Sequence, residues 1–176
     1  AEAAEAGRAR LGTSFDRGVT ANKKTEDERD AAMERLSFTT DIGDFSDQDL
    51  VVEAIIEDED MKVDLFRELD QVLNNSDAIL ASNTSSIPIM KLGTATSRPE
   101  QVIGIHFFNP VPVLRLVELV ESLMTSEETS LRAEAFAGNV LSKRVIRSQD
   151  RAGFVVNALL IPYLLSAIRM MESGFA

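Results

Sequence analysis

The feature of this sequence that most constrains its fold is an alternation of strand-like and helix-like segments between residues 50 and 148. The run LVVEAII at 50–56 is rich in β-branched residues, which is typical of a strand buried on both faces in a parallel sheet. Apolar residues at helical spacing follow over 61–73, and the turn-forming sequence NNSD at 74–77 ends that helix. A strand followed by a helix is one β/α unit.

The same unit recurs up to about residue 148. Further strands are predicted for four runs, AILAS (78–82), VIGIHF (102–107), LRLVELV (114–120) and KRVIRS (143–148). Helices are predicted between them, one from Ser86 to Leu92 and one from the capping pair Thr125 and Glu128 to about Leu141. Alternating units of this kind predict an α/β fold with a doubly wound sheet.

Two helices are predicted before the first of these units. Residues 1–22 carry apolar side chains at helical spacing, and Thr25 with Glu28 matches a capping box at the start of a second helix. The tripeptide at 38–40 has the composition of a brief strand. No strand is predicted before these helices.

The pattern changes again at about residues 147–151. From Asp150 onward, apolar residues lie on most sides of one long helix, as in a buried helix of a helical domain or a subunit interface. We therefore expect two domains, residues 1–148 and residues 149–176.

Charge and composition argue against several classes of protein. Twenty-nine acidic and eighteen basic residues give a net charge of −11, which disfavours nucleic-acid binding. The longest apolar stretch, 154–168, is shorter than the ~18 to 20 residues that span a bilayer, so no membrane partner is expected. The absence of cysteine and the single histidine, His106, exclude thiolate and multi-histidine metal sites and fit a cytoplasmic location.

Polar side chains follow the predicted strands at the points where ligands bind in open α/β sheets, beyond the carboxyl ends of the strands. The candidates are Glu57 after the first strand, Asn83–Ser86 after the second, His106 with Asn109 after the third, and Glu118 within the fourth. We expect these side chains to converge on one site.

His106 and Glu118 are the most informative of these residues. A carboxylate in an apolar segment needs a partner, and an imidazole is a natural one. A Glu–His pair raises the basicity of the imidazole and fixes its tautomer, so that the other nitrogen can accept a proton from a substrate hydroxyl. The alternative is an ion pair with a purely structural role.

The other candidates also have two interpretations each. The run Asn83–Ser86 is either a loop in which Ser85 or Ser86 caps the next helix, or a ligand site that offers hydroxyl and backbone N–H groups. Glu57 and Lys62 are either a solvated charge pair or cofactor contacts. A serine hydrolase is disfavoured because the chain has no G-x-S-x-G elbow.

Four blocks of the sequence resemble the L-3-hydroxyacyl-CoA dehydrogenases, and among them most of all the bacterial 3-hydroxybutyryl-CoA dehydrogenases. The blocks are LVVEAIIEDEDMKVDLFRELD (50–70), ILASNTSSIPI (79–89), VIGIHFFNPVPVLRLVELV (102–120) and DRAGFVVNALLIPYLLSAIRMMESGFA (150–176). The resemblance implies oxidation of the 3-hydroxyl of a short-chain acyl-CoA with NAD, in fatty-acid or butanoate metabolism. It also implies a Rossmann domain followed by an all-helical domain that forms a homodimer.

The resemblance gives each candidate residue a role. It implies that His106 is the general base and that Glu118 is its partner. The further matches are Ser85 and Asn157 as substrate contacts, Asn109 and Ser85 at the nicotinamide side, Glu57 and Lys62 as cofactor contacts, and Ser14 with Lys23 or Lys24 as coenzyme A contacts.

The chain also departs from the family pattern. Gly7, Gly12 and Gly18 lie in a helical stretch and do not form the G-x-G-x-x-G phosphate turn. We therefore expect an incomplete Rossmann-type sheet, followed by the first helix of the helical domain, within a protein of roughly 280 to 300 residues. NADP stays open as the cofactor. The alternatives are a related 3-hydroxy-acid dehydrogenase and a non-catalytic module for acyl-CoA binding or subunit association.

Overall fold

A computed structural model describes residues 2–175 of the chain. It divides into two compact units, Ala1–Asp44 and Phe45–Ala176. The expected domain boundary at 148/149 stays a prediction.

The first unit contains two helices, α1 (Glu2–Thr20) and α2 (Glu26–Glu34), and neither has a buried residue. The predicted capping box is confirmed, because the Thr25 hydroxyl accepts from Glu28 N at 3.1 Å and Thr25 N donates to Glu28 Oε2 at 2.8 Å. The brief strand expected at 38–40 is wrong, since these residues pair with no strand in the described part of the chain. Phe38 instead packs against Arg8, whose guanidinium carbon lies 5.8 Å from the ring centroid.

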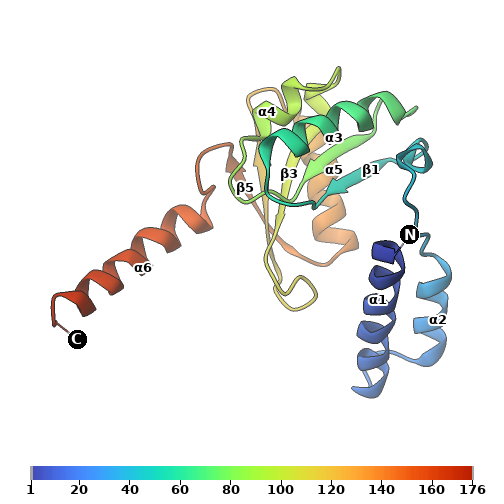
Figure 1. The fold of residues 1–176 in the computed structure, drawn as a ribbon, viewed down its shortest axis with the longest axis horizontal. Helices are drawn as coiled ribbons and strands as arrows, with labels where there is room; N and C mark the ends of the chain where they lie inside the picture. The colour runs from blue at the N-terminus through green and yellow to red at the C-terminus, as the bar shows by residue number, and fades with distance from the viewer. Residues whose placement is uncertain (1, 176) are drawn as a thin grey trace. The chain divides into compact units, whose positions relative to one another are not determined.

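The second unit is built on a five-stranded sheet (Figure 1). Its strands, in spatial order, are β1 (Leu50–Glu53), β2 (Ile79–Ser82), β3 (Val102–Phe107), β4 (Leu116–Glu121) and β5 (Arg144–Gln149). The first three strands are parallel, β4 is antiparallel to β3, and β5 is parallel to β4. The reversal follows from the short connection 108–115, because a parallel connection needs about a dozen residues or more.

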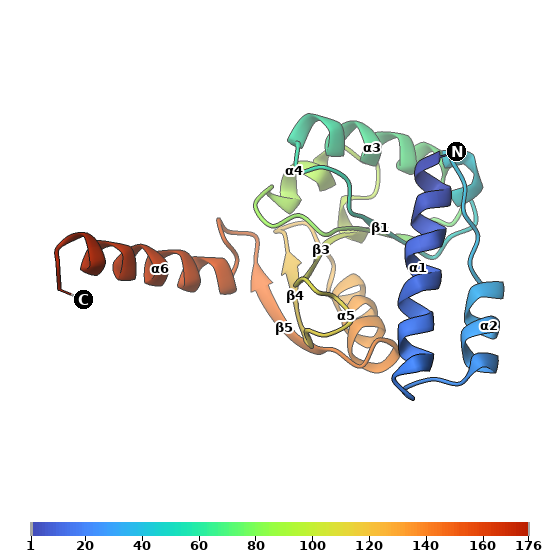
Figure 2. The ribbon, with the colours of Figure 1, turned by 60° about the horizontal axis from the view of Figure 1, so that its bottom comes forward.

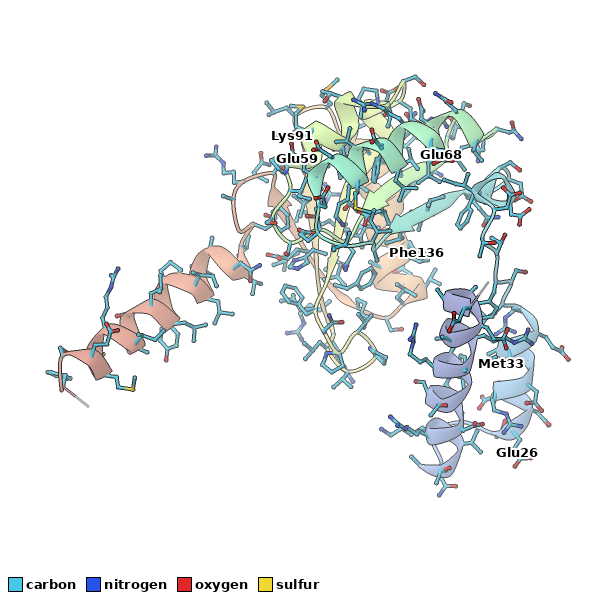
Figure 3. All side chains as sticks on the ribbon, viewed as in Figure 1. Glu26, Met33, Glu59, Glu68, Lys91 and Phe136 are labelled. Carbon is cyan, nitrogen blue, oxygen red and sulfur yellow. The ribbon has the colours of Figure 1, made fainter. Side chains whose placement is uncertain are left out.

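Helices cover both faces of this sheet, and Figures 1 and 2 place α3 (Glu59–Val72) and α4 (Ile89–Thr94) on one face and α5 (Glu127–Ala135) on the other. Three short helical segments complete the connections, η1 (Ile42–Phe45), η2 (Pro99–Gln101) and the π-helical η3 (Phe136–Val140). Figure 3 shows Glu59 and Lys91 side by side, where an ion pair of 2.7 Å joins α3 to α4. The expected α/β fold is confirmed.

The core follows from the alternation of side chains along each strand. Alternate residues of β2, β3 and β4 pack with Ala133 and Ala137 on the α5 face. The intervening residues face α3 and α4, and on this face Gly104 lies against Val120 of β4 and Ile89 of α4. The same face of the sheet carries polar residues at the strand ends.

Two predicted elements begin or end elsewhere. The strand expected at 50–56 ends at Glu53, because the Glu53 carboxylate accepts from Ile55 N at 2.6 Å and turns the chain. The helix expected from Ser86 begins at Ile89, because the Thr84 hydroxyl accepts from Ser86 N and Ile87 N and holds these residues in a turn. Neither Ser85 nor Ser86 is therefore a helix cap.

The helix cap expected at Thr125 is also wrong. Ser126 caps α5, accepting from Thr129 N at 3.1 Å, whereas the Thr125 hydroxyl donates to Val102 O at 2.7 Å. The last helix, α6 (Val156–Glu172), follows β5 and has no buried residue, although a buried helix was expected. In residues 2–175, no helix has the length and apolar character needed to cross a membrane.

The close packing of Gly104 generates a prediction. An added Cβ would lie 2.8 Å from Val120 Cβ and 3.0 Å from Ile89 Cδ1, and Val120 Cβ is fixed to the central sheet. We expect Gly104→Ala to lower the free energy of unfolding by about 1–3 kcal/mol, measured by urea denaturation. Gly138→Ala is the control, since its Cβ would make an ordinary contact of 3.9 Å with Val145. Equal stabilities of the two variants would contradict the prediction.

Candidate active site

The centre of the candidate site is a buried histidine–glutamate pair. His106 and Glu118 are directly opposite each other in the antiparallel β3/β4 register. His106 Nδ1 lies 2.7 Å from Glu118 Oε2, and the two side chains are 8% and 0% exposed. Side chains opposite each other in a sheet point to the same face, so the register itself brings imidazole and carboxylate together.

The second oxygen of Glu118 binds the start of α6. Glu118 Oε1 accepts from Val155 N at 3.0 Å and from Val156 N at 2.9 Å. The first N–H groups of a helix have no partner within the helix, and a carboxylate is well suited to satisfy them. Glu118 therefore links β3, through His106, to the N-terminus of α6.

The imidazole of His106 also contacts two aromatic rings. The ring centroid of Phe108 lies 4.5 Å from that of His106 and is tilted by 55°, and Phe154 makes an edge contact at 5.6 Å and 65°. Among residues 2–175, no protein group forms a hydrogen bond with His106 Nε2. This nitrogen is therefore available to a ligand.

A second cluster lies where β1 and β2 end. Glu57 Oε1 accepts from the Thr84 hydroxyl, from Ser85 N at 2.9 Å, and from Ser86 N and Oγ at 3.2 and 3.0 Å. Burial raises the pKa of the Glu57 carboxyl, but these hydrogen bonds and Lys62 outweigh it and lower the pKa to about 2. The carboxylate thereby orders the loop that carries Ser85.

Lys62 belongs to this cluster. It forms the charge pair with Glu57, but at 1% exposure Lys62 is buried and not solvated. Its Nζ lies 2.6 Å from Glu53 Oε1 and 3.3 Å from Glu57 Oε2. Glu53, which is not among the predicted site residues, is buried and also accepts from Ser82 Oγ at 2.6 Å. The sequence does point to Glu53, because it is the one charged residue within the apolar run LVVEAII at 50–56, which predicts a buried strand.

The remaining candidates lie at the following places. Asn109 is exposed in the loop after β3, Ser85 is exposed beside Glu57, and Asn157 is half-buried in the first turn of α6. Asn83 Oδ1 accepts from Phe107 N at 2.8 Å and so ties the loop of Ser85 to the strand of His106. Ser14 lies on α1 and Lys23 in the turn after it, both in the first unit and exposed.

The lowered pKa of Glu57 predicts a pH dependence of stability. Because the folded-state pKa is about 2 and the ordinary value is 4.5, the stabilisation is complete above pH 4.5 and is lost as the pH falls from 4.5 toward 2. We expect Glu57→Gln to have a lower urea midpoint than the parent at about pH 7, with the difference shrinking toward about pH 3. Glu68→Gln, on the exposed surface of α3, is the control for loss of charge alone. A difference that is constant with pH would refute the prediction.

Comparisons with known proteins identify relatives along the whole chain. Residues 1–151 match the family described as 3-hydroxyacyl-CoA dehydrogenase, NAD binding domain. The chain is 61% identical to the 3-hydroxybutyryl-CoA dehydrogenase of Mycobacterium tuberculosis over 97% of its length and 60% of that protein. It is 41% identical to the probable 3-hydroxybutyryl-CoA dehydrogenase of Bacillus subtilis, over 99% of the chain and 60% of that protein. The chain thus spans about 60% of the length of these curated relatives.

Solved structures of relatives have the same fold. The crystal structure of M. tuberculosis FadB2 matches with a TM-score of 0.95 at 60% identity, covering 100% of this chain and 62% of that one. The (S)-3-hydroxybutyryl-CoA dehydrogenase PaaH1 from Ralstonia eutropha matches with a TM-score of 0.96 at 39% identity, covering 99% and 61%. With a Rossmann-type α/β sheet, a family match over 151 residues and relatives of this similarity, the chain belongs to the 3-hydroxyacyl-CoA dehydrogenase family.

Proposed function

We propose that the protein oxidises the 3-hydroxyl of a short-chain acyl-CoA to a ketone with NAD, in fatty-acid or butanoate metabolism. The observation that carries this proposal is the buried His106–Glu118 pair at the end of β3, where open α/β sheets bind ligands. Relatives named 3-hydroxybutyryl-CoA dehydrogenase match 97% to 99% of the chain and support this substrate class. They favour a dehydrogenase over a module that only binds acyl-CoA.

His106 is the proposed general base. Because the Glu118 carboxylate can only accept hydrogen bonds, Nδ1 carries the ring proton, and the lone pair of Nε2 can accept the proton of the substrate hydroxyl. Glu118 then stabilises the imidazolium that forms. When bound, NAD would supply the acceptor for the hydride on the carbon that carries this hydroxyl, so that loss of the proton to His106 and of the hydride would turn the alcohol into a ketone.

The residues that follow β1, β2 and β3 are proposed to bind the nicotinamide and ribose end of NAD. Glu57 offers a carboxylate oxygen to hydroxyl groups, and the exposed side chains of Ser85 and Asn109 offer hydroxyl and amide groups to a carboxamide. With a pKa of about 2, Glu57 is ionised at neutral pH and disfavours a phosphate beside it. Lys62 contributes its positive charge from beneath Glu57.

Four further residues are proposed to hold the substrate. Ser85 and Asn157 bind the acyl part near His106, in keeping with their places beside Glu57 and in the first turn of α6. Ser14 and Lys23 are proposed contacts of coenzyme A, because both side chains are exposed and an ammonium group suits a phosphate.

We also propose that residues 149–176 begin a helical domain that forms a homodimer. The match to the NAD-binding family ends at residue 151, which supports this boundary. On α6, Leu159, Leu160 and Tyr163 are exposed, and large exposed apolar patches mark interfaces.

We also propose a cytoplasmic location, which the absence of cysteine supports.

The central test is removal of the proposed base. We expect His106→Gln in the native protein to reduce acetoacetyl-CoA reduction by NADH by about 10²- to 10⁴-fold, measured by NADH absorbance, because an amide cannot exchange a proton with the substrate as an imidazole does. Turnover at the parental rate would rule out His106 as the base.

Two comparisons complete this test. Glu68→Gln, outside the site, is expected to retain full activity and controls for handling of the variants. Oxidation of 3-hydroxybutyryl-CoA is then compared with that of free 3-hydroxybutyrate. A preference for the free acid would favour a related 3-hydroxy-acid dehydrogenase instead.

A further inference from the structure

The segment between β5 and α6 has an unusual backbone. Gly153 and Phe154 both have positive φ angles, +78° and +49°. This left-handed region suits glycine, and at Gly153 a Cβ would lie 2.9 Å from Ala158 N. For a bulky residue such as Phe154 the conformation is unfavourable and is retained only where surrounding contacts impose it.

The contacts of Phe154 lead to the candidate base. The residue is 7% exposed, and its ring makes the edge contact with the imidazole of His106. The next two residues donate their N–H groups to Glu118 Oε1. Three consecutive residues therefore contact both members of the His106–Glu118 pair.

The two kinds of contact restrict different motions of the imidazole. The hydrogen bond to Glu118 restrains Nδ1, but a hydrogen bond tolerates small rotations of the ring about the Cα–Cβ and Cβ–Cγ bonds of His106. Aromatic rings packed against the imidazole remove this freedom, because a turned ring would overlap them. Phe108 comes from the strand end itself, whereas Phe154 comes from the junction with α6.

We propose that Phe154 is a positioning residue, which holds the imidazole plane of His106 so that Nε2 faces the substrate. The left-handed conformation of Phe154 lets its ring reach the imidazole while the N–H groups of Val155 and Val156 face Glu118. The orientation of the imidazole thus depends on how α6 begins. For its effect on the reaction, this inference rests on the proposed function of His106.

The single histidine allows a direct test that does not need catalysis. In the chain labelled with ¹⁵N-histidine, every imidazole signal comes from His106. We expect Phe154→Leu to shift and broaden these signals and to speed solvent exchange of the Nδ1 proton, and Phe154→Tyr to restore the parental spectrum. Phe154→Met replaces Phe154→Leu if the latter does not fold.

A matched control separates positioning from loss of stability. Phe66→Leu removes a fully buried ring from α3, and it is expected to destabilise the fold while leaving the His106 signals unchanged. Parental imidazole signals in a folded Phe154→Leu or Phe154→Met chain would overturn the proposal.

Kinetics of the native protein give the second readout. We expect Phe154→Leu to reduce kcat about 10-fold or more, with the KM for NADH little changed, because a misplaced base slows the chemical step. A rise in KM at unchanged kcat would contradict positioning. If the spectra change as expected while His106→Gln retains full activity, the proposed function fails and the contact of Phe154 with His106 stands.

Discussion

The candidate site depends on the buried carboxylate of Glu118. Burying a carboxylate away from water costs free energy unless protein groups donate hydrogen bonds to it. Glu118 has three donors, which are His106 Nδ1 and the N–H groups of Val155 and Val156. These donors come from β3 and from the start of α6, so the carboxylate is satisfied only when both elements are in place. Assembly of the site and docking of the α6 N-terminus are therefore one event.

The same constraint shapes the other end of the site. Glu53 is buried at the end of β1, where its carboxylate pairs with Lys62 and accepts a hydrogen bond from Ser82. Lys62 also forms an ion pair with Glu57. Both buried carboxylates lie on the sheet face covered by α3 and α4. On that face β1, β2 and β3 change from apolar residues to Glu53, Ser82 and His106 near their carboxyl ends, where ligands bind in open α/β sheets.

Local sequence patterns predicted correctly those elements whose boundaries depend on interactions between neighbouring residues. The strand at 102–107 and the Thr25–Glu28 capping box are confirmed, because apolar runs and cap spacing are properties of neighbouring residues. Boundaries were wrong where a side chain competes for backbone groups, as Glu53 does at Ile55 and Thr84 does at Ser86 and Ile87. Whether a side chain or the backbone binds such an N–H group depends on tertiary contacts, and a short window of sequence does not contain them.

The pairing of His106 with Glu118 was predictable from chemistry, but its geometry depends on the direction of β4. Glu118 lies two residues from the amino end of β4. If β4 ran parallel to β3, this end would lie at the opposite edge of the sheet from the carboxyl end of β3. The short connection 108–115 forces the antiparallel direction, which brings the beginning of β4 to the end of β3, where His106 lies. The same reversal turns the amino end of β4, with Glu118, toward the edge formed by the carboxyl ends of β1 to β3. The length of one loop thus decides that the carboxylate meets both the imidazole and the first turn of α6.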